Sequence, residues 1–361
     1  MTREQLSRVF CNLDERQIAE AYQFDPDLCG RSPERIVHMK KKRIITFALA
    51  AALILALGVT AYAIGIHTGF FTSVFGTGLK SRDEFEVAIT DDNGDLVTTE
   101  HYPAIERVDV DEDLAEKLTG DYIASVGQSV NLDGFTFTIQ DALLDDNGIG
   151  ALTVHVSNPN GHGLKQNGIY ENGERPPFGW NVYPQGDEMH MMDMRDYILP
   201  DSFSDTDADF VLYITPFTPL PSDTGLTLLI MVYNDDMNPP DWPKAELTIP
   251  AQEKLPCREL VAEGISAMIS PVGLTLHYDV PGAMEVVDDN IELVFSDGSV
   301  YTIMGENLIN FTVASRSPDQ MTIYYCFNRL CDAENATELR IQSHWYAATN
   351  PETHNVESTL R

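Results

Sequence analysis

Residues 135–156 read FTFTIQDALLDDNGIGALTVHV, and this stretch decides the fold class. Apolar and polar residues alternate from Phe135 to Ile139 and again from Leu152 to Val156, which is the period of a β-strand with one buried face. Between the two runs, Asp145-Asp146-Asn147-Gly148 is a strong signal for a tight hairpin turn. The stretch therefore predicts two antiparallel strands that share one face of a core.

Short runs of the same kind recur along the chain, separated by Pro and Asp clusters, and predict more strands. Asp297-Gly298 gives another hairpin turn signal. The runs form two groups on either side of a linker at residues 250–263. We therefore expect a mainly β fold with two β-sandwich-like domains, residues 121–250 and 258–348, and a tail over 349–361. The further runs are residues 210–214, 226–233, 245–249, 265–269, 274–280, 291–295, 300–303, 321–327 and 339–341.

Residues 44–66 (IITFALAAALILALGVTAYAIGI) contain no ionisable side chain. A helix of this length reaches roughly 35 Å, enough to cross the hydrocarbon core of a bilayer. The small-x-small pattern of Ala61-Tyr62-Ala63 also fits the cleavage site of a signal peptide. The charged segment of 43 residues that precedes it favours a retained transmembrane helix.

The charges beside this segment predict its orientation. Lys and Arg in excess stay on the cytoplasmic side, so residues 1–43 are expected inside and residues 67–361 outside a plasma membrane crossed once. Residues 67–120 then form an extracytoplasmic stalk, with Phe70 and Phe71 expected at the outer membrane interface. The cations that orient the span are Lys40, Lys41, Lys42 and Arg43.

Residues 1–43 have the pattern of short amphipathic helices. Capping signals at Thr2 and Asp14 each precede apolar residues at helical spacing. A segment this short cannot bury enough surface for a core of its own. Its apolar face either fills a groove on a partner protein or packs on itself or on the membrane surface. The residues that would bind a partner are Leu6, Phe10, Leu13, Ile18 and Tyr22.

The formal net charge of −33 is concentrated in the outer region. Residues 1–43 hold nine Lys or Arg against seven Asp or Glu, which leaves about −35 for the rest of the chain. Such a surface repels polyanions. Nucleic acid is therefore excluded as a partner of the outer region, and the lipid bilayer is contacted by the span.

The sequence predicts no enzyme, no cofactor and no metal site. It lacks the Gly-x-Ser-x-Gly, His-Glu-x-x-His, phosphate-loop and dinucleotide-binding patterns. Cys11 and Cys29 fall inside, and an odd number of cysteines falls outside, where Cys257, Cys326 and Cys331 lie. Whether Cys326 and Cys331 form a disulfide is left open by the sequence.

Two stretches carry a resemblance to a known family. Residues 130–156 (VNLDGFTFTIQDALLDDNGIGALTVHV) and 265–278 (ISAMISPVGLTLHY) resemble two successive outer modules of single-pass, anti-sigma-factor-like membrane proteins of Gram-positive bacteria. The layout of the inner segment, with Asn12-Leu13-Asp14 and Ile18-Ala19-Glu20-Ala21 before a Lys-rich flank, is similar too. The resemblance implies that residues 1–43 sequester a cytoplasmic sigma factor. The zinc-binding pattern of a His followed by Cys-x-x-Cys is absent.

The leading hypothesis is thus a single-pass signalling protein that senses through its outer β domains and holds a sigma factor inside. The alternative is a membrane-tethered surface or cell-wall binding module without a sigma partner. The sequence does not identify the outer ligand in either case.

Overall fold

The computed structural model describes residues 69–90, 96–159, 177–204, 206–233, 241–281, 283–347 and 350–361. The chain divides into two compact units, Met1–Ala63 and Ile64–Arg361, and all described residues belong to the second. Among them, no helix combines the length and the apolar character that crossing a membrane requires. The predicted span, residues 44–66, lies outside the described residues.

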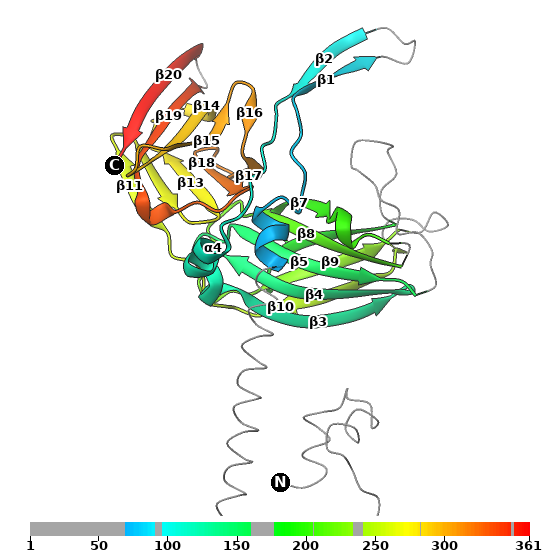
Figure 1. Ribbon diagram of the computed structural model, residues 1–361. Helices are drawn as coiled ribbons and strands as arrows, with labels where there is room; N and C mark the ends of the chain where they lie inside the picture. The colour runs from blue at the N-terminus through cyan, green and yellow to red at the C-terminus, as the bar shows by residue number, and fades with distance from the viewer. Residues whose placement is uncertain are drawn as a thin grey trace, which may run out of the picture. The chain divides into compact units, whose positions relative to one another are not determined.

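The described part of the chain is mainly β, as the sequence predicts (Figure 1). Two sheets that we call the first sheet pair are formed between residues 124 and 249. Their strand orders are β3-β4-β5-β8-β7 and β10-β9-β6, and all neighbouring strands are antiparallel. The strands are β3 (Ala124–Leu132), β4 (Phe135–Leu144), β5 (Gly150–Ser157), β6 (Phe178–Pro184), β7 (Asp193–Ile198), β8 (Asp207–Thr215), β9 (Leu226–Val232) and β10 (Lys244–Ile249).

The predicted hairpin is confirmed, because β4 and β5 pair antiparallel on either side of the Asp145 turn. The Asp145 carboxylate accepts hydrogen bonds of 2.9 Å from the backbone N–H groups of Asn147 and Ile149, which fixes the turn from within. Gly148 has φ +89°, and a Cβ there would lie 2.7 Å from Leu220. Glycine is therefore required at this corner.

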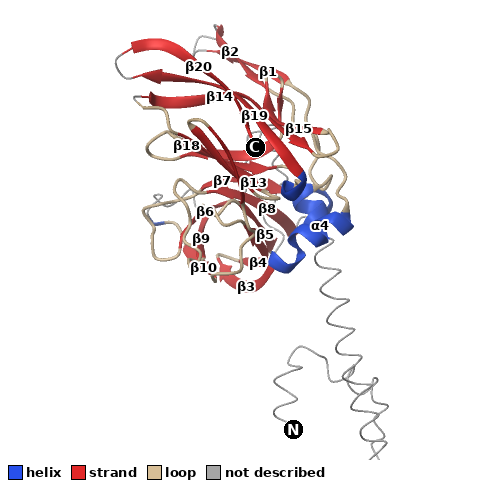
Figure 2. Ribbon diagram, turned by 90° about the vertical axis from the view of Figure 1, so that its left-hand side faces the viewer, coloured by secondary structure: helices blue, strands red, loops and turns tan. Residues whose placement is uncertain are grey.

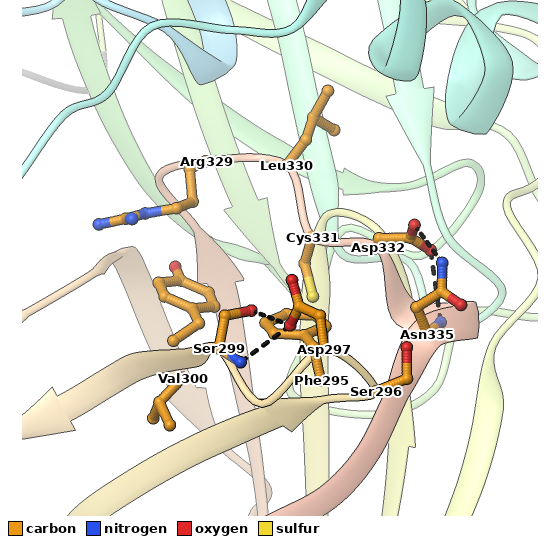
Figure 3. Close-up of a pocket in the computed structure, with 11 residues that line it drawn as sticks. Phe295, Ser296, Asp297, Ser299, Val300, Arg329, Leu330, Cys331, Asp332 and Asn335 are labelled. Atoms are coloured by element: carbon orange, nitrogen blue, oxygen red, sulfur yellow. Dashed lines mark hydrogen bonds between the residues drawn. The ribbon is translucent and has the colours of Figure 1, made fainter.

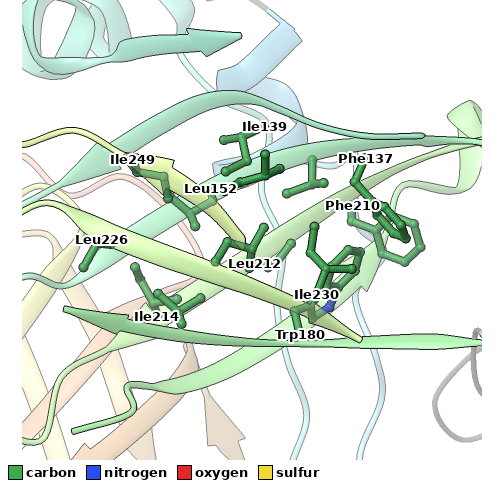
Figure 4. Close-up of a cluster of buried hydrophobic side chains, with 14 of the residues drawn as sticks. Phe137, Ile139, Leu152, Trp180, Phe210, Leu212, Ile214, Leu226, Ile230 and Ile249 are labelled. Atoms are coloured by element: carbon green, nitrogen blue, oxygen red, sulfur yellow. The ribbon is translucent and has the colours of Figure 1, made fainter. Parts of the chain in front are cut away.

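The inward-facing side chains of the two sheets form one core (Figure 4). Phe137 and Phe210 come from the five-stranded sheet, and Trp180 and Ile230 come from the three-stranded sheet. The rings of Trp180 and Phe210 meet edge to face, with centroids 5.0 Å apart, a favourable arrangement of their quadrupoles. Alternation from Phe135 to Ile139 thus places every second residue of this half of β4 in the layer between the sheets.

The second sheet pair is formed between residues 258 and 360. Its sheets have the orders β11-β12-β13-β18-β17 and β16-β15-β14-β19-β20, and they enclose a core of their own. The strands are β11 (Arg258–Ala262), β12 (Ile265–Ile269), β13 (Gly273–Tyr278), β14 (Ala283–Phe295), β15 (Val300–Gly305), β16 (Leu308–Ile309), β17 (Phe311–Arg316), β18 (Thr322–Phe327), β19 (Ala336–Ala347) and β20 (Asn350–Leu360).

Two strands of this pair lie where the sequence predicts a linker and a tail. β11 lies within the predicted linker, and β20 occupies the predicted tail and pairs with β19 from Leu339 to Ala347. The backbone N–H and C=O groups of Val261 and Arg361 also bond each other at 3.4 Å. These two strands form because their backbone groups pair with β12 and β19. Their sequences lack a clear alternation of apolar residues, so sequence reasoning missed them.

Residues 67–120 are more structured than the predicted stalk. Residues 69–75 form a helix that we call the junction helix, and Asp111 caps α4 by accepting from the Leu114 N–H. This region also contains the hairpin strands β1 (Phe85–Thr90) and β2 (Leu96–Tyr102), the helix α4 (Glu112–Thr119) and, directly after it, the 3₁₀ helix η3 (Gly120–Tyr122). Two further 3₁₀ helices, η4 (Pro200–Ser202) and η6 (Ala333–Asn335), lie in the two sheet pairs.

The expectation that Phe70 and Phe71 lie at the membrane interface is wrong. Their exposed fractions are 3% and 1%, because both pack into a third core between the two sheet pairs, which we call the junction core. Figure 2 shows the helices gathered on one side of the sheets. The junction core joins Phe70, Phe71, Val74 and Phe75 to Leu143, Ile149, Ala151, Val211 and Tyr213 of the first sheet pair and to Val272, Val313, Tyr324 and Cys326 of the second.

We predict that Phe137→Ala lowers the free energy of unfolding by about 3–5 kcal/mol, because it leaves a cavity in a fully buried site. Urea unfolding of the full chain measures the change. Thr138→Ala, on the opposite face of β4, is the matched control and is expected to cost less than about 1 kcal/mol. Equal losses for the two variants would contradict the assigned alternation of β4.

Candidate functional site

A pocket of about 480 Å³ opens at one end of the second sheet pair. Its walls are the turn between β14 and β15 and the segment 328–335 between β18 and β19 (Figure 3). The turn is the predicted Asp297-Gly298 hairpin signal, and Gly298 has the φ of +84° that this signal anticipates. The lining residues are Phe295, Ser296, Asp297, Ser299, Val300, Tyr301, Arg329, Leu330, Cys331, Asp332 and Asn335.

Arg329 is the cation of the pocket wall, and two contacts hold it. Its guanidinium carbon lies 4.6 Å from the centroid of the Tyr301 ring, a cation–π contact. Its Nη2 lies 2.9 Å from Oε2 of Glu106, whose side chain is 58% exposed. The Tyr301 hydroxyl in turn donates to the carbonyl oxygen of Asn310 at 2.6 Å, which fixes the ring. The guanidinium is thereby presented in one orientation.

Two carboxylates also line the pocket, and each is fixed by a local donor. Oδ1 of Asp297 accepts from the N–H and the hydroxyl of Ser299 at 2.8 and 2.6 Å. These bonds lower the pKa of Asp297, so this side chain is ionised at neutral pH. Oδ2 of Asp332 accepts from Nδ2 of Asn335 at 2.7 Å. The pocket therefore carries one positive and two negative groups at defined places.

The pocket thiol is not a nucleophile. Cys331 is 2% exposed, and burial raises its pKa far above that of a free thiol, so it stays protonated. Cys326 and Cys331 are both free, which answers the question of a disulfide between them. Within the described ranges, no group of three or more His, Cys, Asp or Glu side chains is placed to hold a metal ion. The arrangement suits recognition of a polar ligand.

Arg107 connects this region to the junction helix. It is 7% exposed, and its Nη1 lies 3.3 Å from the carbonyl oxygen of Val74, 3.1 Å from the Tyr213 hydroxyl and 3.0 Å from the carbonyl oxygen of Asn328. Val74 is in the last turn of the junction helix, where carbonyl groups lack partners within the helix. A cation there also interacts favourably with the helix dipole. Arg107 thus joins the helix to both sheet pairs.

Tyr213 reinforces the same contact. Its hydroxyl donates to the carbonyl oxygen of Val74 and lies beside Arg107. Burial raises the pKa of this phenol to about 12, and the charge of Arg107 acts against that shift. The phenol therefore stays neutral and keeps its proton for the helix carbonyl.

Asp145 makes a second connection between the sheet pairs. It is 1% exposed and accepts at 2.8 Å from the hydroxyl of Ser270, which lies in the turn between β12 and β13. Burial raises its pKa to about 6, against the lowering effect of the Ile149 N–H and the Ser270 hydroxyl, while the charge of Asp146 raises it further. The turn predicted from sequence thus also serves as a contact between the two sheet pairs.

The residues that the sequence proposed for partner binding and orientation all lie outside the described residues. They are Leu6, Phe10, Leu13, Ile18 and Tyr22, and Lys40, Lys41, Lys42 and Arg43. Sequence reasoning missed Arg107 and Arg329, which belong to no local motif. The one available signal was the rarity of cations in so acidic a part of the chain. A rare cation there is a candidate for a structural or binding role.

Comparison with known proteins adds little to this geometry. No protein-family model matches the chain, and no curated protein matches it. The chain is similar to a conserved domain protein from Bacillus anthracis, with 13% identity and a TM-score of 0.38, over 66% of this chain and 90% of that one. It is also similar to the N-terminal periplasmic domain of ScsB from Proteus mirabilis, with 12% identity and a TM-score of 0.18, over 66% and 98% of the two chains. Scores this low carry no functional argument, so the site is interpreted from its own contacts.

We predict that Arg107→Met lowers the free energy of unfolding by about 1–3 kcal/mol, since it removes the Arg107 donor from the buried carbonyl oxygen of Asn328 and leaves that of Val74 with the Tyr213 hydroxyl only. It should also speed amide hydrogen exchange in residues 74–78 at the end of the junction helix. Arg340→Met, on a side chain 48% exposed, is the control and is expected to change stability by less than about 0.5 kcal/mol. Unchanged exchange in Arg107→Met would show that this contact does not hold the helix.

We predict that Asp145 makes stability fall as pH rises from about 4 to 6. Its pKa of about 6 in the folded chain lies above the value near 4 expected for the unfolded chain, so the folded state binds the proton more tightly. The contribution is fully present below pH 4 and lost above pH 6, and it amounts to about 3 kcal/mol. Asp145→Asn should remove this slope in urea unfolding, whereas Asp279→Asn, on an exposed side chain, should retain it. Identical pH profiles for wild type and Asp145→Asn would refute the assignment.

Proposed function

We propose that the chain is a single-pass plasma-membrane signalling protein, similar to anti-sigma factors, and not an enzyme. In this proposal residues 44–66 cross the bilayer and residues 1–43 hold a cytoplasmic sigma factor through Leu6, Phe10, Leu13, Ile18 and Tyr22. The two sheet pairs are β-sandwich-like domains on the outer side that receive a signal. A change outside then alters how firmly the inner segment holds its partner.

The observation that carries this proposal is the burial of the junction helix. The predicted span ends at residue 66, and the first described residue, Gly69, is already helical. Phe70, Phe71, Val74 and Phe75 are at most 3% exposed, in contact with both sheet pairs. A tether that only displays a domain needs no such contact, since a flexible linker serves it equally well. A rigid connection is what transmission from the sheet pairs to a span requires.

A second observation connects the pocket with that helix. Glu106, which pairs with Arg329 in the pocket wall, directly precedes Arg107, which contacts the last turn of the helix. Nδ2 of Asn328 also donates to the carbonyl oxygen of Glu106 at 3.0 Å. A change at Arg329 therefore acts one residue away from the group that holds the helix. Such a short path supports coupling between an outer ligand and the span.

The test is capture of a sigma factor by the full chain, purified in detergent through a C-terminal tag from cells of its own host. We expect a sigma factor to co-purify with the wild type and to be lost from Phe10→Asp, because a charge on the apolar face opposes docking in a groove. Ser7→Asp, at a polar position of the same segment, is the matched control and should retain the partner. Mass spectrometry of the eluates measures the difference.

Absence of any sigma factor from the wild-type eluate, or equal recovery with Phe10→Asp, would contradict sequestration. The alternative, a membrane-tethered surface or cell-wall binding module, predicts that outcome and also predicts that deletion of residues 2–30 leaves surface binding unchanged. Reporter fusions at both ends test the topology separately: the proposal places the N-terminus inside and the C-terminus outside.

A further inference from the structure

The pocket beside Arg329 has a charge arrangement that selects a class of ligand. Arg329 is the one cation among its eleven lining residues, and Asp297 and Asp332 are the acids. We propose that this pocket binds a small zwitterion, with the ligand carboxylate on Arg329 and the ligand ammonium group on Asp297 and Asp332. The inference rests on the proposed function, because it names the ligand whose binding would be the outer signal.

Arg329 is suited to a ligand carboxylate. Its present counter-ion, Glu106, is not a lining residue and is 58% exposed, so their ion pair is of the weak surface kind. Among the described residues, only Nη2 of this guanidinium has a hydrogen-bond partner. The stack on Tyr301 fixes the plane of the group, and a planar guanidinium binds carboxylates through paired N–H donors. A ligand in the pocket can therefore use Nη1 or replace Glu106.

The two aspartates are suited to an ammonium group. The two hydrogen bonds from Ser299 both end on Oδ1 of Asp297, which leaves Oδ2 for a ligand, and the residue is exposed. Asp332 lies on the wall opposite the turn, and Asn335 bonds both of its carboxylate oxygens: Nδ2 donates to Oδ2 at 2.7 Å and the backbone N–H to Oδ1 at 3.4 Å (Figure 3). Each oxygen keeps a second lone pair for a further donor. An ammonium group offers three donors in different directions, so one that binds Oδ2 of Asp297 keeps donors for other oxygens of the pocket.

Neither a simple anion nor a simple cation satisfies all three groups. An anion is repelled by Asp297, by Asp332 and by the negative field of a chain with formal charge −33. A cation leaves Arg329 beside it as a like charge. A zwitterion pairs with both kinds of group, and Val300, which is 49% exposed at the rim, offers apolar contact to a small side chain. The pocket volume of about 480 Å³ is within the range of small-molecule sites.

The experiment is calorimetric titration of the purified full chain with three zwitterions, namely glycine, lysine and the dipeptide Ala-Ala. Acetate and methylamine, which carry one of the two charged groups each, are the matched probes. We expect at least one zwitterion to bind about tenfold more tightly than acetate or methylamine. Arg329→Gln and the double variant Asp297→Asn, Asp332→Asn should each weaken that binding about tenfold, and Arg340→Gln should not change it.

Circular dichroism of each variant shows whether it folds. If Arg329→Gln does not fold, Arg329→Lys replaces it, because lysine keeps the charge and loses the paired donors. The proposal is overturned if no zwitterion binds at about 10 mM, if acetate or methylamine binds as tightly, or if the Arg329 variant binds as well as the wild type. Because no sigma factor is present in this titration, its failure is distinguishable from failure of the capture experiment.

Discussion

The burial of the junction helix is the contact on which the described part of the chain depends. Phe70, Phe71, Val74 and Phe75 fill the space between two sheet pairs that have separate cores. Each buried side chain of this size contributes about 1.5–3 kcal/mol relative to exposure in water, as an upper estimate. Without them, apolar groups such as Leu143 and Tyr324 would face water. The helix is therefore an integral part of the fold that the two sheet pairs form.

Arg107 gives this apolar contact a fixed geometry. A buried guanidinium costs free energy unless it is hydrogen-bonded. Here Nη1 donates to the carbonyl oxygens of Val74 and Asn328 and to the Tyr213 hydroxyl, while Nε has no partner among the described residues. These partners come from the helix, from the first sheet pair and from the segment that lines the pocket. Apolar packing tolerates small displacements, whereas directed polar contacts do not. One side chain thus aligns three parts of the molecule.

The acidic character of the chain gives the few cations of the sheet pairs and their junction particular roles. A formal charge of −33 keeps the surface soluble by repulsion and repels other polyanions. Within that field Arg107 is buried at the junction, and Arg329 lies on an aromatic ring beside a pocket. Arg107 directly follows Glu106 and Arg329 directly follows Asn328, and Nδ2 of Asn328 donates to the carbonyl oxygen of Glu106. The pocket cation Arg329 and the junction cation Arg107 are thus connected through the contacts of Glu106 and Asn328.

The sequence by itself determined the elements whose cause is local. Alternation in residues 135–156 and the Asp145 and Asp297 turns predicted strands and hairpins that the structure contains, because side-chain period and turn conformation depend on neighbours along the chain. Tertiary structure alone decided the rest. β20 forms because the edge of β19 supplies its backbone hydrogen-bond partners. The apolar side chains of the junction helix are buried only because the two sheet pairs surround them. Glu106 and Arg329 are 223 residues apart in sequence, and they meet only after both sheet pairs have formed.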